Sequence, residues 1–270
     1  METLTQNLRS VVRSTPFLHK MLRVVLKRVR RTRIKDGPEA TEKGRFRRYC
    51  LDLAKTVREP VFVKVGANDG LTGDPCSDIL LADLNWTGLL IEPVPYCFDR
   101  LRTHFQDSRR FRLEQVAIGA SAAQVSFYYV DPKAGQSLPN LPSWFDQLGS
   151  FDRNHIVKHL DGALEPFIVE CLIQVYPLSE VLARNGIDDV HLLHVDTEGH
   201  DYEVIKTVNF AEHPPLSIFI EHKHLSADHR AEMLGLLYGH GYSVRDCGED
   251  YFAIDEKATR LGRTEGLYGG

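Results

Sequence analysis

Short apolar runs that alternate with helical segments constrain the fold of this chain most strongly. Strands are predicted at VFVKV (61–65), TGLLI (87–91), FRLEQVAIG (111–119), VHLLHVD (190–196), LSIFIEH (216–222) and YSVRDCGEDYFAID (242–255). Helices are predicted between them at 46–57, 77–85, 96–106, 201–208 and 227–241. This alternation is typical of an α/β fold with a mostly parallel sheet and helices on both faces.

The alternation breaks between the third and fourth strands. Residues 124–130 alternate between polar and apolar positions, as an exposed strand does, and residues 131–170 then show prolines and no clear period. An irregular stretch of this length inside a compact domain is more often functional than idle. We therefore predict one domain over 45–260, with an insert at about 131–170, and a C-terminal tail at 261–270.

The N-terminal segment is basic, whereas the rest of the chain is acidic. Residues 1–48 hold fourteen Lys and Arg against four Asp and Glu, about +10, which leaves about −14 for the remainder of a chain of net charge −4. Apolar residues within 17–31 share one stripe of a helix, so 1–44 is predicted to be a basic amphipathic helix and a linker. The helix would contact an anionic membrane surface through 17–33, or pack its stripe on the body.

Partners and compartment follow from these patterns. A basic arm on an acidic body argues against a nucleic-acid partner. The five cysteines are scattered and form no C-x-x-C pair, so neither a disulfide framework nor a zinc knuckle is indicated. The chain shows neither a secretory signal nor a window of about 18 uncharged apolar residues. We expect a cytoplasmic protein, peripheral at the inner face of the membrane where the basic helix binds lipid.

A glycine turn after the first strand predicts a nucleotide-like ligand. In VFVKVGANDG (61–70), Gly66 and Gly70 allow close backbone approach, and Asn68 tolerates unusual backbone angles. Glu92 ends the next strand, 22 positions after Gly70. A carboxylate at this spacing commonly accepts hydrogen bonds from ribose hydroxyls. The sequence therefore predicts an adenosine-containing ligand at the carboxyl edge of the sheet.

The charges around this turn discriminate among adenosine ligands. The G-x-G-x-x-G pattern of dinucleotide sites is missing, and Asp69 and Asp74 would repel a diphosphate. S-adenosylmethionine carries a sulfonium and an ammonium, which nearby carboxylates attract. A nicotinamide-dependent oxidoreductase is therefore the weaker alternative.

Titratable residues gather after two later strands. LLHVDTEGHDYEVIK (192–206) delivers Asp196, Glu198, His200, Asp201 and Glu203 at a strand-to-helix junction, where helix capping would explain only one or two of them. The next strand ends in IEHKHL (220–225), which contains Glu221, His222 and His224. Both groups are predicted at the binding edge of the sheet.

Four segments together resemble the FkbM family of S-adenosylmethionine-dependent methyltransferases, in the branch associated with polysaccharide biosynthesis. They are VGANDG (65–70), GLLIEPVPYCFDRL (88–101), LLHVDTEGHDYEVIK (192–206) and IEHKHL (220–225). The D-x-E-G-x-D core is the specific part of the resemblance. The resemblance implies a class I methyltransferase fold, with a seven-stranded sheet and an antiparallel last strand. It also implies methyl transfer to a hydroxyl, with a sugar of a surface glycan or of its precursor as the expected acceptor.

The resemblance also implies where the cofactor binds. Gly66, Asn68 and Gly70 would line the methionine part, Glu92 would bind the ribose, and Ala117 and Ile118 would border the adenine. Asp69 and Asp196 are added to this set because their charges favour the methyl donor.

Lys64 is a departure from the family pattern, because many members carry Asp at its position. Asp69 or Asp74 would then supply the charge that attracts the amine of the methyl donor, while Lys64 turns its ammonium towards a neighbouring carboxylate. A catalytically inactive, methyltransferase-like binding protein is the alternative that this lysine raises.

The predicted catalytic residues are His222, Asp196 and Glu198. A sugar hydroxyl is a poor nucleophile, so a base is expected, and His222 is predicted in that role with Glu221, Asp196 or Glu198 orienting it. Alternatively, Asp196, Glu198, Glu221 and His222 would bind a divalent cation that holds acceptor hydroxyls.

The insert is predicted to form the acceptor side. Within the insert, Trp144 offers a flat apolar face for a sugar ring and His155 offers a hydrogen-bonding group. Glu221, at the end of the strand 216–222, is also predicted to contact the acceptor. His159 would share a helical face with His155. A lid that packs on the body without touching substrate is the alternative.

Overall fold

The computed structural model describes residues 42–256, except 73, 74, 76, 83, 84 and 107. The predicted basic helix, its membrane contact over 17–33, Asp74 and the tail at 261–270 lie outside the described residues. Within the described part of the chain, no helix combines the length and the apolar character that crossing a bilayer requires.

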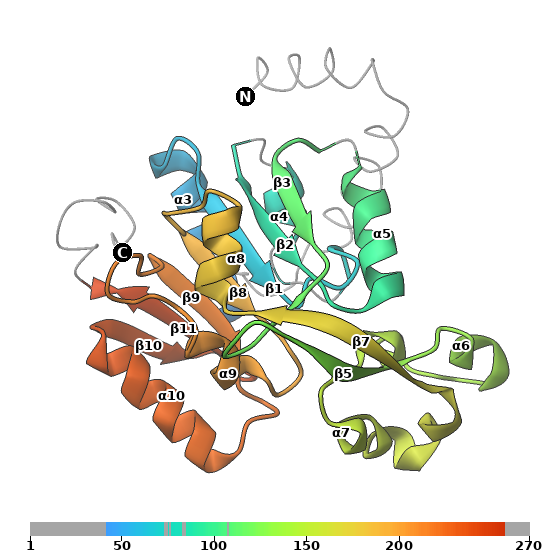
Figure 1. Ribbon diagram of the computed structural model, residues 1–270. Coiled ribbons are helices and arrows are strands. Elements are labelled where there is room, and N and C mark those ends of the chain that lie inside the picture. Colours follow the sequence, from blue (N-terminus) through green and yellow to red (C-terminus); the bar gives the residue numbers. More distant parts are fainter. Residues whose placement is uncertain (1–41, 73–74, 76, 83–84, 107, 257–270) are drawn as a thin grey trace, which may run out of the picture.

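A seven-stranded sheet forms the centre of the protein (Figure 1). Its strands, in spatial order, are β3 (Phe111–Glu114), β2 (Thr87–Ile91), β1 (Val61–Val65), β8 (Leu192–Val195), β9 (Ser217–Glu221), β11 (Asp250–Asp255) and β10 (Tyr242–Asp246). All pairings are parallel except the two that involve β11. The order reverses between β1 and β8, which is where open α/β sheets bind ligands. The predicted fold class is confirmed.

Helices cover both faces of this sheet because successive strand residues point to opposite sides. One face packs against α3 (Glu42–Thr56), α4 (Ser77–Ala82) and α5 (Pro95–Phe105); the other packs against α8 (Leu178–Arg184), α9 (Asp201–Ile205) and α10 (Ala227–Gly239). In β1, Phe62 belongs to the first core and Val63 to the second. Strands buried on both faces account for the continuous apolar runs in the sequence.

A second sheet carries the insert, in the order β4 (Ala117–Ile118), β7 (Ile168–Tyr176), β5 (Ala123–Val130) and β6 (Gly149–Ser150). Strand β7 pairs antiparallel with β5 along the whole of β5, so it belongs to this second sheet and not to the main one. Between these two strands lie α6 (Ala134–Ser137), α7 (Arg153–Val157) and the 3-10 turns η2 (Phe145–Gln147), η3 (His159–Gly162) and η4 (Glu165–Phe167).

The insert has a small apolar core of its own. Val130, Ala134, Leu148, Ile156 and Leu164 are all buried together there. The β5–β7 ribbon therefore holds a compact subdomain beside the carboxyl edge of the main sheet (Figure 1).

Helix α3 is anchored by one aromatic stack, which gives a test of its place in the domain. Phe46 is fully buried, and its ring lies 3.9 Å from that of Phe219 on β9. We expect Phe46→Ala to lower the free energy of unfolding in urea by about 3–5 kcal/mol, because it opens a cavity in the core. Leu51→Ala on the same helix, at a side chain that is 40% exposed, is the matched control and should change it by less than about 1 kcal/mol. Equal effects of the two substitutions would contradict the packing of α3.

Candidate active site

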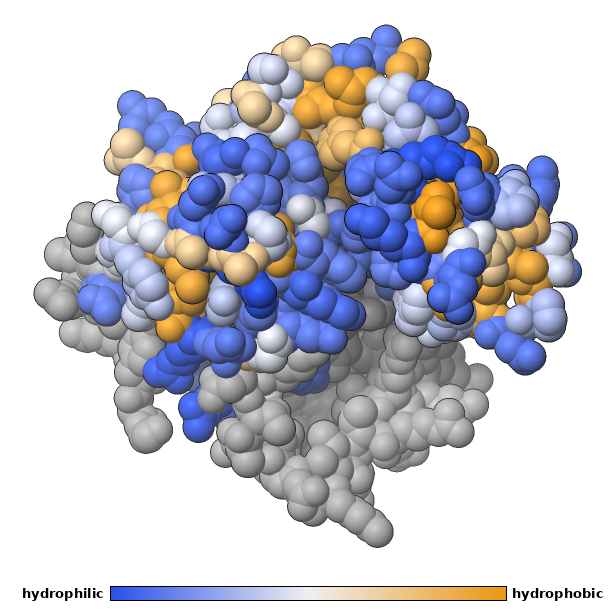
Figure 2. Space-filling view, turned by 90° about the horizontal axis from the view of Figure 1, so that it is seen from below, coloured by the Kyte–Doolittle hydropathy of each residue, from blue (hydrophilic) through white to orange (hydrophobic). Residues whose placement is uncertain are grey.

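A cavity of about 510 Å³ opens at the carboxyl edge of the sheet, between the strand ends and the insert. Its lining comes from the turns after β1, β2, β8 and β9, from β4, and from the insert around Trp144 and Ser150. Figure 2 views the molecule from below and shows mixed hydrophilic and apolar residues, with a furrow between the part that contains α10 and the insert. The cavity thus lies where the strand order reverses, as expected for a ligand site.

Sterics explain the first glycine of the turn after β1. Gly66 has φ +80, and a Cβ on it would lie 1.7 Å from the carbonyl oxygen of Asp196. Only glycine permits this contact between the turns after β1 and β8. Asn68, with φ +48, also lines the cavity.

Glu92 fixes this turn through both of its carboxylate oxygens. Its Oε2 accepts a hydrogen bond from the backbone N–H of Asn68 at 2.7 Å, and its Oε1 accepts one from Val94 at 2.8 Å. Burial raises the pKa of Glu92 to about 7, although these two hydrogen bonds and Lys64 oppose the rise. Glu92 therefore lines the cavity as a carboxyl whose charge changes near neutral pH.

Asp69 and Gly70 do not line the cavity, although both were predicted to bind the cofactor. Asp69 is buried and accepts hydrogen bonds from the backbone N–H groups of Leu71 and Thr72. A Cβ on Gly70 would lie 2.5 Å from the ring of Phe105. These two residues shape the turn and pack it on α5, and the structure does not place them in the cavity where the cofactor was predicted to bind.

Arg100 connects this turn to the insert. One of its nitrogens lies 2.8 Å from Asp69 and another lies 2.8 Å from Asp146, which is two residues from Trp144. Burial raises the pKa of Asp69, but the Thr72 and Leu71 hydrogen bonds and Arg100 outweigh it and hold that pKa below its usual value. Asp69 is therefore favoured in its ionised form, which makes an ion pair with Arg100.

Lys64 is buried at the end of β1, where it also lines the cavity. Its Nζ lies 3.4 Å from Nδ1 of His194 on the neighbouring strand, and its charge lowers the pKa of Glu92. This contact of the ammonium is with an imidazole, and the predicted pairing of Lys64 with a carboxylate stays a prediction.

Asp201 organises the turn after β8. Its two carboxylate oxygens accept hydrogen bonds from the backbone N–H groups of Thr197 and Gly199, at 2.9 and 3.0 Å. Glu198 between them has φ +54, a left-handed conformation that is rare for a residue with a side chain. Both Glu198 and Asp196 line the cavity.

Carboxyl groups crowd the middle of the cavity wall. Burial and the neighbouring Asp196 raise the pKa of Asp201 to about 7. Burial, Asp196, Asp201 and Glu198 raise the pKa of Glu221 to about 9. Crowded carboxyls of this kind are more readily protonated, and a cation bound beside them would relieve the repulsion.

His222 lies outside the lining of the cavity, although it was predicted to be the base. Its ring stacks on Tyr251 with centroids 3.8 Å apart, and its Nε2 lies 3.8 Å from Asp246 on the far side of β9. Glu221 lines the cavity, and the next residue of an extended strand points the opposite way. In this arrangement His222 does not reach an acceptor in the cavity.

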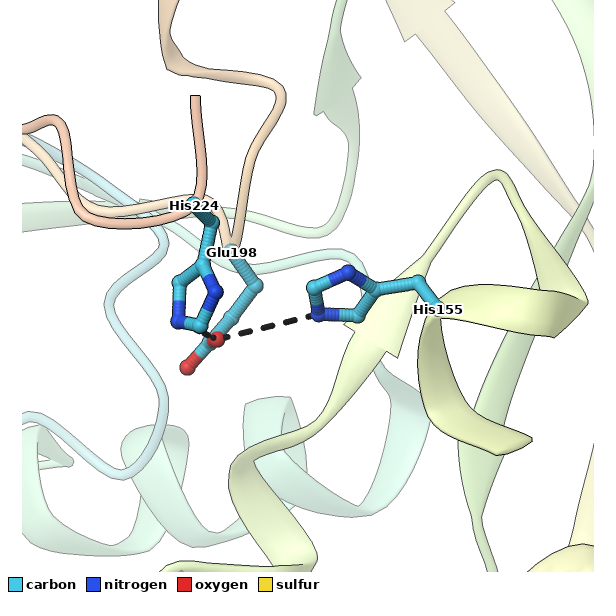
Figure 3. Close-up of side chains that lie close together, drawn as sticks. All are labelled: His155, Glu198 and His224. Atoms are coloured by element: carbon cyan, nitrogen blue, oxygen red, sulfur yellow. Dashed lines mark ion pairs between the residues drawn. The ribbon is translucent and has the colours of Figure 1, made fainter. Parts of the chain in front are cut away.

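Three side chains converge at the end of the cavity nearest the insert: His155, Glu198 and His224 (Figure 3). Nε2 of His224 lies 3.2 Å from Oε2 of Glu198, and Nε2 of His155 lies 3.9 Å from the same oxygen. Burial raises the pKa of Glu198, but the two imidazoles outweigh it and lower that pKa to about 2. The predicted metal set of Asp196, Glu198, Glu221 and His222 is not brought together, since only Glu198 belongs to this cluster.

Trp144 and His159 complete this end of the cavity, where their rings are 5.6 Å apart. Trp144 is 39% exposed and presents a ring face at the rim. Ala117 and Ile118 line the opposite part of the cavity as an apolar edge. Of the predicted substrate residues, Trp144 and Glu221 line the cavity, and His155 stands behind it against Glu198.

Four buried polar atoms of this wall have no hydrogen-bond partner among the residues that the structure describes. They are Asn68 Oδ1, Thr197 Oγ1, His200 Nε2 and Glu221 Oε2, and all four residues line the cavity. Such atoms are rare in folded proteins unless a ligand or water satisfies them. Thr197 was not singled out in the sequence, because a threonine in a strand-end turn carries no distinctive signal.

The sequence matches the model of the methyltransferase FkbM domain over residues 64–248 of 270. The chain belongs to the FkbM methyltransferase family. Within that match lie the whole glycine turn, Glu92, the insert and the turn after β8. No curated protein matches the sequence.

Two solved structures are similar to this chain at low sequence identity. A methyltransferase FkbM from Methylobacillus flagellatus KT is 16% identical, with a TM-score of 0.44, over 73% of this chain and 44% of that one. An Aeropyrum pernix fibrillarin with natively bound S-adenosylmethionine is 11% identical, with a TM-score of 0.39, over 74% and 66% of the two chains. The chain thus spans less than half of the Methylobacillus protein.

The crowding of carboxyls predicts how stability depends on pH. Because the pKa of Glu221 rises from 4.5 to about 9 on folding, the folded protein keeps a proton that the unfolded chain releases, so stability falls as pH rises through this window. We expect Glu221→Gln to raise the free energy of unfolding of the ligand-free protein by on the order of 1–3 kcal/mol at about pH 8, and to change it little at about pH 4.

Glu180→Gln, at an exposed position of α8, is the matched control and should follow the wild type at every pH. The measurement is urea unfolding across the pH range. Parallel curves for wild type and Glu221→Gln would contradict the raised pKa.

Proposed function

We propose that the protein is an S-adenosylmethionine-dependent O-methyltransferase that acts on a hydroxyl of a sugar, in a surface glycan or its precursor. One observation carries the proposal: a single cavity joins an adenosine-type turn to a carboxylate-rich wall and an aromatic, imidazole-lined end. Family membership supplies the reaction class, and the residues of the cavity support the donor and the acceptor.

The glycine-turn end fits the adenosine part of the donor. Glu92 would accept hydrogen bonds from ribose hydroxyls, since each of its oxygens uses one lone pair on a backbone N–H and keeps another. Ala117 and Ile118 would border the adenine, and the free Oδ1 of Asn68 would accept from the donor's amine.

The carboxylate wall fits the charge of the donor. Bound there, S-adenosylmethionine would supply an electrophilic methyl group on a sulfonium. Asp196 and Glu221 would face these positive charges, and the charges would in turn stabilise the ionised carboxyls. A nicotinamide dinucleotide brings phosphates instead, which this wall would repel.

The insert end fits a polyhydroxy acceptor. Trp144 offers a ring face, and His159, His200 and His224 offer imidazole nitrogens to hydroxyl groups. Aromatic faces with surrounding polar groups suit the apolar and hydroxylated sides of a sugar ring. The basic segment at 17–33 would hold the enzyme at an anionic surface, which supports a glycolipid acceptor and a location at the inner face of the membrane.

Calorimetric titration with S-adenosylmethionine and transfer of isotope-labelled methyl groups to a panel of sugars test the proposal. We expect binding with one donor per chain and label in an ether linkage on the sugar. A chain that binds no donor would be the inactive binding protein, and label on nitrogen or carbon would contradict the hydroxyl acceptor.

Trp144→Ala separates the acceptor end from the cofactor end. We expect KM for the sugar to rise at least about tenfold, because a large contact face is lost, while the donor Kd changes less than about twofold. Leu172→Ala, at an exposed β7 residue outside the cavity lining, is the control. A change in the donor Kd with no change in KM for the sugar would contradict the assignment of Trp144 to the acceptor end of the cavity.

Ribose binding by Glu92 predicts a pH dependence of affinity. The pKa of Glu92 is about 7, and the ionised carboxylate accepts hydroxyl hydrogen bonds better, so affinity should rise as pH rises through about 7. 5′-Methylthioadenosine isolates this effect because it lacks a titrating amine. We expect Glu92→Gln to bind it more weakly and without this pH dependence; a pH-independent wild type would contradict the role.

A further inference from the structure

The cluster of His155, Glu198 and His224 joins three segments that are far apart in the sequence. His155 lies on α7 of the insert, Glu198 in the turn after β8, and His224 after β9 (Figure 3). One ligand-type atom from each residue lies within 4.8 Å of the other two. Both imidazoles direct Nε2 at the same oxygen of Glu198.

Two further observations indicate that the cluster of His155, Glu198 and His224 is built to bind a ligand. Nε2 of His155 is buried and makes no hydrogen bond within the described part of the chain, since its distance of 3.9 Å to Glu198 is beyond hydrogen-bond range. Glu198 adopts φ +54, and Asp201 holds the flanking N–H groups so that this strained backbone persists. Strain and an orphaned nitrogen at one point are typical of a functional site.

The distances are close to those of a coordination sphere. Ligands at about 2.0–2.2 Å from a tetrahedral ion lie roughly 3.4 Å from one another. The His224–Glu198 pair, at 3.2 Å, already meets this spacing, and the His155–Glu198 pair, at 3.9 Å, needs only a small inward movement of the imidazole.

We propose that His155, Glu198 and His224 bind a divalent transition-metal cation, of which Zn²⁺ and Mn²⁺ are the representative cases. Two imidazoles and one carboxylate suit such ions, whereas Mg²⁺ and Ca²⁺ prefer oxygen ligands. Glu198 and His224 line the cavity, so the remaining coordination positions face it. The site differs from the acidic set predicted from the sequence, because the insert supplies one of its ligands.

The position of the ion gives it a role that rests on the proposed function. A hydroxyl of the acceptor can occupy an open coordination position beside Trp144 and His159. Coordination lowers the pKa of a bound hydroxyl, so that its proton passes to water more readily and its oxygen becomes a better nucleophile. The same ion would join the insert to the main sheet, since His155 is on one and Glu198 and His224 are on the other.

Metal binding is measured without any methyl donor. Chelator-treated protein is titrated with Zn²⁺ or Mn²⁺ alone, and bound metal is counted by elemental analysis. We expect one ion per chain, and at least about tenfold weaker binding in His155→Ala and in His224→Ala, since each loses one of three ligands. Co²⁺-loaded protein should show a visible absorption band that changes in both variants.

His229→Ala is the control, because that imidazole lies on α10 against Tyr202, outside the cavity lining. It should bind the ion as the wild type does. Because His155 lies on the insert and is half-buried, we expect His155→Ala to leave the folding of the main sheet intact. Weaker metal binding by this variant therefore reports on the site itself. Failure to bind Zn²⁺ or Mn²⁺, equal binding by the variants, or equal affinity for Mg²⁺ would overturn the proposal. A chain that binds metal but no S-adenosylmethionine would contradict the proposed function and leave the metal site standing.

Discussion

Mutual repulsion of carboxyl groups at one edge of a parallel sheet determines most of what this structure can do. The carboxyl ends of two neighbouring strands, β8 and β9, bring Asp196, Asp201 and Glu221 together. Burial and the neighbouring carboxylates raise the pKa values of Asp201 and Glu221 to about 7 and about 9. Two backbone N–H groups donate hydrogen bonds to Asp201 and so offset part of the cost of burying it. Glu221 has no such compensation at its Oε2, which has no hydrogen-bond partner among the described residues. A wall of this kind is less stable empty than occupied by a cation, which is the physical basis for a positively charged methyl donor.

The two ends of the cavity are connected through charged side chains. Asp69 closes the turn after β1 and pairs with Arg100, which also binds Asp146, two residues from Trp144. At the other side, Glu198 from the main sheet faces His155 from the insert. The insert is therefore positioned by both the turn after β1 and the turn after β8. Its geometry should respond to whatever binds at either.

The sequence predicted the parts of the fold and site that depend on local pattern. Strand and helix alternation gave the sheet, and the spacing from Gly70 to Glu92 placed a carboxylate at the cavity, because both depend on short-range geometry. The steric need for Gly66 was predictable as a close approach, although its partner, the carbonyl of Asp196, lies 130 positions away in the sequence.

Other features of the site depend on which side of a strand a side chain occupies, and on the pairing of strands that are far apart in the sequence. His222 and Glu221 are adjacent in the sequence, yet strand alternation sends them to opposite sides, and the sequence alone did not identify the side that faces the cavity. Asp69 and Gly70 are residue types that often bind ligands, but here Asp69 accepts hydrogen bonds within the turn and Gly70 packs against Phe105. His155 meets Glu198 only because β5 pairs with β7 and folds the insert back, and no local pattern encodes that pairing.

Proton release on donor binding tests the central claim most directly. Titration calorimetry with S-adenosylmethionine at about pH 7.5, in buffers of different ionisation enthalpy, counts the protons exchanged. Asp201 and Glu221, whose pKa values are raised to about 7 and about 9, should lose protons when a cation binds beside them. The amine of the donor titrates equally in both proteins, so the account predicts that the wild type releases more protons than Glu221→Gln. An equal proton count in the two proteins would contradict it.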